Sequence, residues 1–462
     1  MVTVEVLMRE RIQGLRTQVA RLDGGQFVDG AHRQAPLCWG QRWSWHEQQL
    51  PAGQRSPGLH LVRLVELPDG ARTDDVRAAL QLLVTRHTVL RSTFAVPASG
   101  GVPLQTVWPA EDARYELGAF DDAAHARTWS QGRDLDIAAQ WPLRAAVGPV
   151  RPGVLGVLLV VHHIAADQYA FDLLCAELLD AVRAAVRQLC LPLPPADRQP
   201  VELANFEQST VGVQVTERAL GHWLRHDDDL GESLTRLRAG AGPPSGQLHL
   251  TRVVVDGGAS RLAELGAATQ ASAVAVAVAA VACTLARHLD REVVPMTMRI
   301  ANRHRPGYAR SVSSLAQSGL LVVPVTDPGD LAGVAPAAWS ATLHAMRHAY
   351  YDGDELSERM PALDSGRRHA TVVPPSVNVV PVDELPPAPV PRLSTGDGPA
   401  VWAGQVDSPC LGLDFHVGIG ASGLAIELRA GTHLVAGDDA VGLVREAMAL
   451  ILGERHAVAA LR

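Results

Sequence analysis

The sequence predicts an α+β fold built from two lobes. Three observations support this class: the chain has 462 residues, its apolar residues alternate between strand and helix patterns, and consecutive prolines interrupt it after residue 193. One hydrophobic core rarely serves more than about 300 residues, so two cores are expected. We therefore predict a helical extension over residues 1–30, an N-terminal lobe over 31–200 and a C-terminal lobe over 201–462.

The first predicted helices are amphipathic. Between residues 6 and 22 the apolar side chains recur at alternating spacings of four and three, which indicates a helix with one apolar face. This helix either packs on the body of the protein or docks to another protein. A second helix is predicted over 74–87 and a strand over 93–96. The apolar face of the second helix comprises Val76, Leu80, Leu83 and Val84.

An apolar strand followed by two histidines is the most informative segment. Residues 154–161 are continuously apolar and rich in β-branched side chains, which indicates a strand covered on both faces. His162, His163 and Asp167 follow, and the apolar spacing after them predicts a helix over 168–187. The histidines are therefore expected in a strand-to-helix turn, where a base would lie between buried and accessible space.

The second half alternates helices and strands in the same way. It contains a predicted helix over 206–226, a strand over 248–255, an Ala-rich helix over 271–286 and a strand over 293–300. The last strand contains a proline, which predicts a position near the edge of its sheet. The Ala-rich helix is shorter than a typical membrane span, so we interpret it as a buried core helix.

Composition argues against several classes of function. The net charge is −8 and no long basic block occurs, so neither nucleic acid nor an anionic membrane is an expected partner. All 41 Lys+Arg residues are arginine, which rules out a lysine Schiff base. The five cysteines are scattered and odd in number, which argues against a disulfide framework. The N-terminus lacks the apolar core of a secretory signal, and a cytoplasmic location is expected.

Four segments, in this order, resemble motifs of the condensation domains of nonribosomal peptide synthetases. Residues 36–43 (PLCWGQRW) resemble the opening motif of that family, and residues 86–94 (RHTVLRSTF) resemble the second. Residues 162–167 (HHIAAD) resemble the active-site motif His-His-x-x-x-Asp-Gly, and residues 301–306 (ANRHRP) resemble its Asn-Arg segment. A lone His-x-x-x-Asp also marks other acyltransferases of the same fold, whereas the ordered set is specific.

The resemblance implies a pseudo-dimer of two chloramphenicol-acetyltransferase-like lobes, with the active site in a tunnel between them. It implies a free-standing, monomeric acyltransferase that binds no cofactor of its own. An acyl or peptidyl carrier protein would deliver an acyl or aminoacyl thioester on its phosphopantetheine arm. The acceptor, a small molecule or a second carrier-bound group, would attack through an amine or a hydroxyl and form an amide or an ester.

The resemblance also assigns roles to the histidine motif. His163 is expected to accept the proton of the nucleophile or to hold the nucleophile by a hydrogen bond, because a histidine with a pKa near 6.5 can act as a base at neutral pH. His162 is expected to form hydrogen bonds inside the fold. Asp167 is expected to pair with an arginine and fix the turn. Its candidate partners are Arg303, Arg144 and Arg91.

Gln168 departs from the family pattern, which has glycine at this position. Its side chain would narrow the acceptor channel, select a different acceptor, or abolish condensation. The alternative function is therefore a catalytically silent platform that recruits a carrier protein or a tailoring enzyme. Both histidines and the aspartate are retained, which favours the enzyme.

Further polar residues are candidates for lining the substrate channel. The resemblance places them after the Asn-Arg segment and on a later asparagine-containing strand: Ser311, Ser313, Ser314, Gln317 and Asn378. No metal site is expected, because adjacent histidines rarely converge on one ion and no third ligand is spaced nearby. A serine hydrolase is not expected either, because the sequence has no Gly-x-Ser-x-Gly elbow.

Overall fold

The computed structural model describes residues 33–50, 55, 59–112, 115–131, 134–189, 193–239, 241–243, 245–360, 373–382, 385, 388–393, 399–408, 410, 412–421 and 423–453. It divides into two compact units. Unit 1 comprises the chain up to Val213 together with Ala301–Ala316, and unit 2 comprises Gln214–Ile300 and the chain from Gln317. The mixture of helices and sheets confirms the predicted α+β class. The helix predicted over 6–22 and the 1–30 extension lie outside the described residues.

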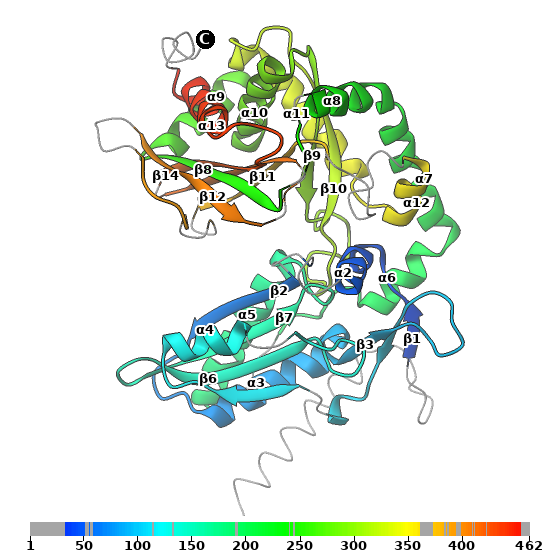
Figure 1. Cartoon of the computed structure of the whole chain (residues 1–462). Coiled ribbons are helices and arrows are strands. Elements are labelled where there is room, and N and C mark those ends of the chain that lie inside the picture. The colour runs from blue at the N-terminus through cyan, green and yellow to red at the C-terminus, as the bar shows by residue number, and fades with distance from the viewer. Residues whose placement is uncertain are drawn as a thin grey trace, which may run out of the picture. The chain divides into compact units, whose positions relative to one another are not determined.

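Unit 1 contains a four-stranded sheet, a three-stranded sheet and the helices that cover them, as far as the chain is described (Figure 1). Its strands are β1 (Arg33–Pro36), β2 (His60–Glu66), β3 (Ser92–Ala95), β4 (Leu104–Val107), β5 (Glu116–Ala119), β6 (Leu143–Arg151) and β7 (Val154–His162). Its helices are α2 (Trp39–Gln49), α3 (Thr73–Arg86), α4 (Ala123–Gln131), α5 (Gln168–Val186) and α6 (Pro200–Glu207), with short 3₁₀ turns at Thr88–Arg91 and Ala110–Asp112.

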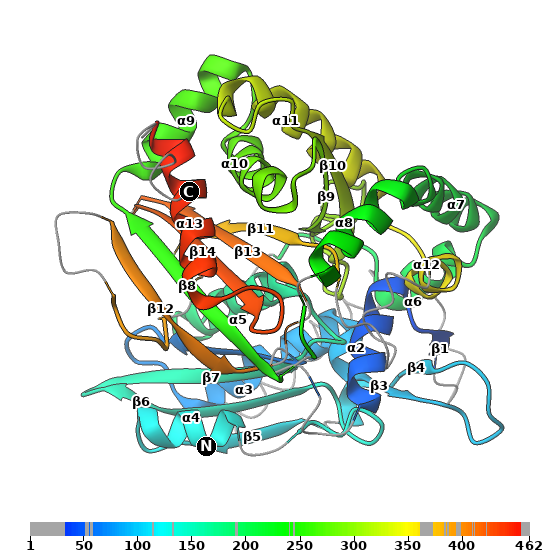
Figure 2. The ribbon, with the colours of Figure 1, turned by 45° about the horizontal axis from the view of Figure 1, so that its top comes forward.

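Strand β7 is covered on both faces, as its continuous apolar run predicts. It lies between β2 and β6 in the order β2-β7-β6-β5. Val157, Leu159 and Val161 pack in one core with α3 and α5, whereas Leu158 and Val160 pack in a second core with α4 (Figure 2). Because successive side chains of a strand point to opposite faces, one apolar run can serve both cores.

Unit 2 contains a seven-stranded sheet in the order β10-β9-β11-β13-β14-β8-β12, counted over the described strands. The strands are β8 (Gln247–Val255), β9 (Val293–Ile300), β10 (Gln317–Pro324), β11 (Ser376–Pro381), β12 (Ala400–Asp407), β13 (Leu413–Gly420) and β14 (Gly423–Gly431). The helices are α8 (Asp227–Ala239), α9 (Gly258–Thr269), α10 (Ala273–Leu289), α11 (Leu331–His348), α12 (Gly353–Arg359) and α13 (Gly437–Leu452); α7 (Thr210–Leu224) crosses from unit 1 into unit 2.

The Ala-rich segment forms the centre of unit 2. Helix α10 is buried along nearly its whole length and packs against α9, α11 and α13 (Figure 1), which confirms the predicted core helix. Among the described helices none is alone long and apolar enough to cross a membrane. Helices α9 and α10, which meet at a 95° bend, pass that test only as a pair, by length and composition.

One sequence-based expectation about an element was wrong, and one about a strand position was met. The helix predicted over 206–226 is divided between α6 and α7, because the Ser209 hydroxyl accepts a hydrogen bond from the Gly212 N–H (3.2 Å) and starts a new helix. Strand β9 lies second in its sheet, beside the edge strand β10, which agrees with the predicted position near the edge. Its Pro295 is tolerated there because β11 pairs with β9 only at Thr297 and Met298.

The division into units also differs from the predicted lobes. The prediction assigned residues 301–316 to the C-terminal lobe, but this segment packs within unit 1. The reason is a set of polar contacts to α5 and to the chain before α6, which are described below. The segment therefore leaves unit 2 after β9 and returns to it at β10.

Candidate functional site

Asp167 organises the turn between β7 and α5. It is buried and forms the N-cap of α5, where its Oδ1 accepts a hydrogen bond from the Ala170 N–H (2.9 Å). Oδ2 accepts from the N–H groups of Leu315 (2.9 Å) and Ala316 (3.0 Å). Arg303 donates from Nη2 to Oδ1 at 2.7 Å. One carboxylate thus joins the start of α5 to both ends of the segment 301–316.

Only one of the three candidate arginines contacts Asp167. Arg144 donates to the Ser130 carbonyl (2.7 Å) and lies over the Trp129 ring. Arg91 donates to the carbonyls of Val84 (3.0 Å) and Trp108 (2.7 Å), so it fixes the backbone around the second motif. Arg303 is therefore the partner in this structure, and its guanidinium also lies 5.1 Å from the ring centroid of Tyr169.

His162 is a buried, neutral histidine. Its Nδ1 accepts a hydrogen bond from the Ile164 N–H (3.1 Å), so the proton is on Nε2, which donates to Oε1 of Gln48 (3.2 Å). Burial lowers the pKa of His162 to about 3, with further lowering by the neighbouring charges of His60 and His163. An imidazole with both nitrogens engaged and no tendency to protonate is suited to holding the turn in place.

His163 differs from its neighbour because its side chain is only partly buried. Its backbone N–H donates to the Leu59 carbonyl (2.7 Å), which fixes the residue at the end of β7. The imidazole meets the indole of Trp43 on α2 edge to face, with ring centroids 5.4 Å apart and an interplanar angle of 71°. Of the two motif histidines, His162 is fully buried, whereas His163 keeps part of its surface accessible.

Gln168 is the first residue of α5, and its side chain is exposed. Its amide donates to Oδ1 of Asp172 (3.0 Å), one helical turn further on, and Asp172 in turn pairs with Arg63 (2.6 Å). The glutamine side chain therefore lies along the surface of α5. Its backbone has no positive φ, so the conformation at this position does not require the glycine of the family motif.

The candidate channel residues are divided between the two units. Ser311, Ser313 and Ser314 are buried in unit 1, where the Ser311 hydroxyl donates to the Arg198 carbonyl (2.5 Å). Gln317 belongs to unit 2 and is buried, with its amide bonded to the backbone of Tyr351 (2.7 and 3.3 Å). Asn378, also in unit 2, is half-buried on β11 opposite His416.

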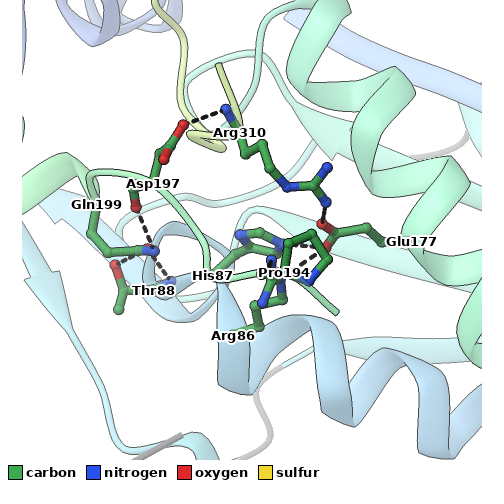
Figure 3. Close-up of polar contacts among 8 residues, drawn as sticks. All are labelled: Arg86, His87, Thr88, Glu177, Pro194, Asp197, Gln199 and Arg310. Carbon is green, nitrogen blue, oxygen red and sulfur yellow. Dashed lines mark hydrogen bonds and ion pairs between the residues drawn. The ribbon is translucent and has the colours of Figure 1, made fainter. Parts of the chain in front are cut away.

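A second buried carboxylate, Glu177 on α5, gathers three basic side chains (Figure 3). The Glu177 carboxylate accepts hydrogen bonds from Nε of Arg86 (3.1 Å), Nε2 of His87 (2.7 Å) and Nη2 of Arg310 (2.9 Å). The Arg310 backbone N–H also donates to Asp197 (2.7 Å). These contacts hold the segment 301–316 at a second point of α5.

The charge states of Glu177 and His87 follow from their contacts. Burial lowers the pKa of His87, which outweighs the opposing effect of Glu177, so we assign a neutral imidazole with its proton on Nε2. Burial raises the pKa of Glu177, but the His87 hydrogen bond and the charges of Arg86 and Arg310 lower it further than burial raises it. Glu177 is therefore an ionised carboxylate inside unit 1.

Sequence reasoning missed Glu177 and Trp43. Glu177 could have been found, because it follows Leu174 by three residues and precedes Ala181 by four, which places a carboxylate on the apolar face of a helix. Trp43 carried no comparable signal, since its neighbour His163 lies 120 positions further along the chain. Among the described residues no group of three or more His, Cys, Asp or Glu side chains is arranged to hold a metal ion.

Comparison with protein families gives one strong match. The family model described as "Condensation domain" matches residues 34–379, about three quarters of the chain. Among curated proteins, the nonribosomal peptide synthetase kk1B of Curvularia clavata is 28% identical over 297 residues, covering 61% of this chain and 2% of that protein. The isonitrile lipopeptide synthase of Mycobacterium tuberculosis is 27% identical over 317 residues, covering 64% of this chain and 12% of that protein.

The solved structures that resemble this chain share its fold. A structure described as showing condensation domain-mediated chain release from the enacyloxin polyketide synthase aligns with a TM-score of 0.68 at 21% identity, covering 96% of this chain and 87% of that one. A complex of the X-domain and OxyB from teicoplanin biosynthesis aligns with a TM-score of 0.66 at 18% identity, covering 94% and 96%. At these identities the likeness shows the fold alone.

Proposed function

Because the chain belongs to the condensation domain family, we propose that it joins a carrier-tethered acyl or aminoacyl thioester to an amine or hydroxyl acceptor. The observation that carries this proposal is the difference between the two motif histidines. His162 is buried, neutral and hydrogen-bonded on both nitrogens. His163 is fixed at the same strand end but is only partly buried, and a base that meets a substrate must be accessible.

The proposed reaction uses His163 as a general base or as the group that orients the nucleophile. Its Nδ1 is buried, so we assign the contact with the acceptor to Nε2. As the acceptor nitrogen or oxygen attacks the thioester carbonyl, its proton passes to Nε2 and the carbonyl oxygen becomes an oxyanion. When that intermediate collapses, the carbon–sulfur bond breaks and the proton goes to the departing thiolate of the phosphopantetheine arm. General base catalysis typically contributes about 10²- to 10⁴-fold to such a step.

Asp167 and Arg303 act on the turn in this proposal. Their ion pair, with the backbone donors of Leu315 and Ala316, sets the direction in which α5 leaves the histidines. Neither group is assigned a contact with substrate. A carrier protein is the expected partner, because members of this family work on carrier-bound substrates.

The test uses the purified full chain with an acyl-loaded carrier protein and an amine or alcohol acceptor. The expected product is an amide or ester detected by mass spectrometry, and His163→Ala is expected to lower its rate about 100-fold or more. His125→Ala, an exposed histidine on α4, is the matched control and should retain the full rate. Equal rates for wild type and His163→Ala would exclude the role given to His163.

A second function is favoured by one observation, the glutamine at position 168. A chain that has lost condensation activity would act as a platform for a carrier protein or a tailoring enzyme. Its signature is a complex with the carrier, measured by calorimetry, that is unchanged by His163→Ala, together with no product from any carrier tested. Product formation by the wild type excludes a purely silent platform.

A further inference from the structure

The indole of Trp43 is the large apolar group that lies beside the proposed base. It is 43% exposed, although it contacts the imidazole of His163. Helix α2 is buried at Trp39, Gly40, Gln41 and Ser44, so Trp43 lies on a face of the helix that points away from the core. An aromatic side chain that is left half exposed next to a catalytic group has surface available for a ligand.

Helix α2 is held rigidly to the elements around the site. At its start the Trp39 N–H donates to the buried carboxylate of Glu207 (2.8 Å). A Cβ atom on Gly40 would lie 1.9 Å from the Ser314 carbonyl oxygen, so the helix packs directly on the segment 301–316. Near its end, Gln48 accepts the hydrogen bond from His162. The indole is therefore placed by a fixed scaffold and does not depend on a mobile loop.

This geometry constrains any acceptor that His163 could serve. A nucleophile must lie about 2.6 to 3.2 Å from the imidazole nitrogen that takes its proton. The carbon atoms next to that nucleophile are then within a few bond lengths of the imidazole ring. The Trp43 centroid is only 5.4 Å from the His163 centroid, so an acceptor that approaches on that side of the imidazole meets the indole.

We propose that Trp43 is a specificity-determining residue that forms an apolar wall of the acceptor site and favours acceptors with a flat apolar group next to the amine or hydroxyl. This inference rests on the proposed function. The indole makes a large contact area with a flat apolar group, whereas it makes only a small contact area with a small aliphatic acceptor. Its effect is therefore expected mainly in the discrimination between acceptors.

The kinetic test compares benzylamine and propylamine as acceptors, with octanoyl-pantetheine as donor. Trp43→Ala is expected to lower kcat/KM for benzylamine about 10- to 100-fold, mostly through KM, and that for propylamine only a few-fold. Trp43→Phe is expected to restore most of the preference. Trp45→Phe is the matched control, because Trp45 lies two residues away on another face of α2 and packs in the core of unit 1. Circular dichroism verifies that each variant is folded.

An equal loss for both amines in Trp43→Ala would overturn the proposal, since the indole would then act only through His163. If the wild type forms no product, either the proposed function is wrong or octanoyl-pantetheine is not a donor for this protein. A binding measurement then tests the role of Trp43. Ligand-observed NMR would then measure benzylamine binding to the full chain. Weaker binding by Trp43→Ala than by Trp45→Phe supports the acceptor wall, whereas equal binding, or none by the wild type, overturns it.

Discussion

Two buried carboxylates ten residues apart, at the start and in the middle of α5, are satisfied in different ways. Asp167, at the N-cap, receives three backbone N–H groups and one arginine. Glu177, in the middle of the helix, receives only side chains, namely Arg86, His87 and Arg310. Both are almost completely buried, so neither charge could persist without these partners.

The position on the helix explains the difference. At a helix N-terminus the first N–H groups have no partner within the helix and the helix dipole favours a negative charge. In the middle of a helix every backbone N–H is already bonded, so Glu177 must recruit basic side chains from other elements. Backbone N–H donors do not titrate, and a change of side chain leaves them in place. The Glu177 group, in contrast, includes a histidine.

The two groups share one task, which is to hold the segment 301–316 within unit 1. Asp167 binds it through Arg303, Leu315 and Ala316, and Glu177 binds it through Arg310. The segment leaves β9 and returns to β10, both in unit 2. Substitutions that weaken either group therefore test how much each one contributes to unit 1.

The largest effect is expected for Asp167→Asn. The amide nitrogen would face the N–H donors of Leu315 and Ala316, and the buried Arg303 would lose its countercharge. Removing one partner of a buried ion pair costs about 3 to 5 kcal/mol. The measurement is urea unfolding followed by circular dichroism. Asp172→Asn, on the exposed side of the same helix, is the control, and a loss no greater than in that control would refute the role of Asp167.

A smaller loss is expected for Glu177→Gln. Arg310 is 36% exposed, so it can be hydrated when the carboxylate is removed, and Arg86, although its side chain is buried, keeps its hydrogen bond to the Pro194 carbonyl. Loss of hydrogen bonds that involve a charged group then costs about 2 kcal/mol. The same unfolding experiment measures it. If Glu177→Gln destabilises more than Asp167→Asn, the contrast between backbone and side-chain partners is wrong.

The third prediction concerns the effect of pH on the Glu177 group. The pKa of His87 is lowered by burial, so below about pH 6.5 the unfolded chain binds a proton that the folded chain does not. Stability is then lost as pH falls, by at most about 1.4 kcal/mol per pH unit for one group. Glu177, whose pKa is also lowered, adds a loss of the same sign below about pH 4.5.

The variant His87→Gln keeps an N–H donor for Glu177 but removes the titrating ring. Its free energy of unfolding should fall less steeply than that of the wild type between about pH 7.5 and 5.5. Other buried histidines act in both proteins and cancel in the difference. His46→Gln, exposed on α2, controls for the substitution itself. Parallel slopes for wild type and His87→Gln would rule out protonation of the unfolded chain at His87 as a source of acid sensitivity.

The elements of the site could be predicted from sequence where one local pattern decided them. The strand predicted over 154–161 and the helix predicted over 168–187 are confirmed as β7 and α5. The unbroken run of β-branched apolar residues favours a strand, and the helical repeat of apolar residues favours a helix. The boundary near Ser209 was missed, because a single hydroxyl decides it and periodicity does not detect a cap.

Long-range partners could not be chosen from sequence. Arg303, Arg144 and Arg91 were equal candidates for Asp167, since an arginine can bond to carbonyls or rings as well as to carboxylates. The choice depends on where the segment 301–316 packs, and the predicted lobes placed it in the other half. The contact of Trp43 with His163 could not be predicted for the same reason, because it requires α2 to pack on the segment 301–316.

The smallest effect on stability is expected at Gln168, one residue beyond the carboxylate that backbone donors hold. Its backbone has no positive φ and its side chain is exposed, so Gln168→Ala should change the free energy of unfolding by less than about 1 kcal/mol. Gln168→Gly should cost slightly more, because glycine weakens the first turn of α5 through its larger backbone entropy. Urea unfolding measures both variants, and a gain in stability from the glycine would contradict this interpretation of the turn.

The same two variants test whether the glutamine side chain restricts the acceptor. If it does, Gln168→Ala and Gln168→Gly should raise the condensation rate with a bulky amine equally, because both remove the side chain beyond Cβ. Gln214→Ala, at an exposed glutamine on α7, is the matched control and should leave that rate unchanged. A gain in Gln168→Gly alone would instead assign the restriction to the backbone, which the observed φ argues against.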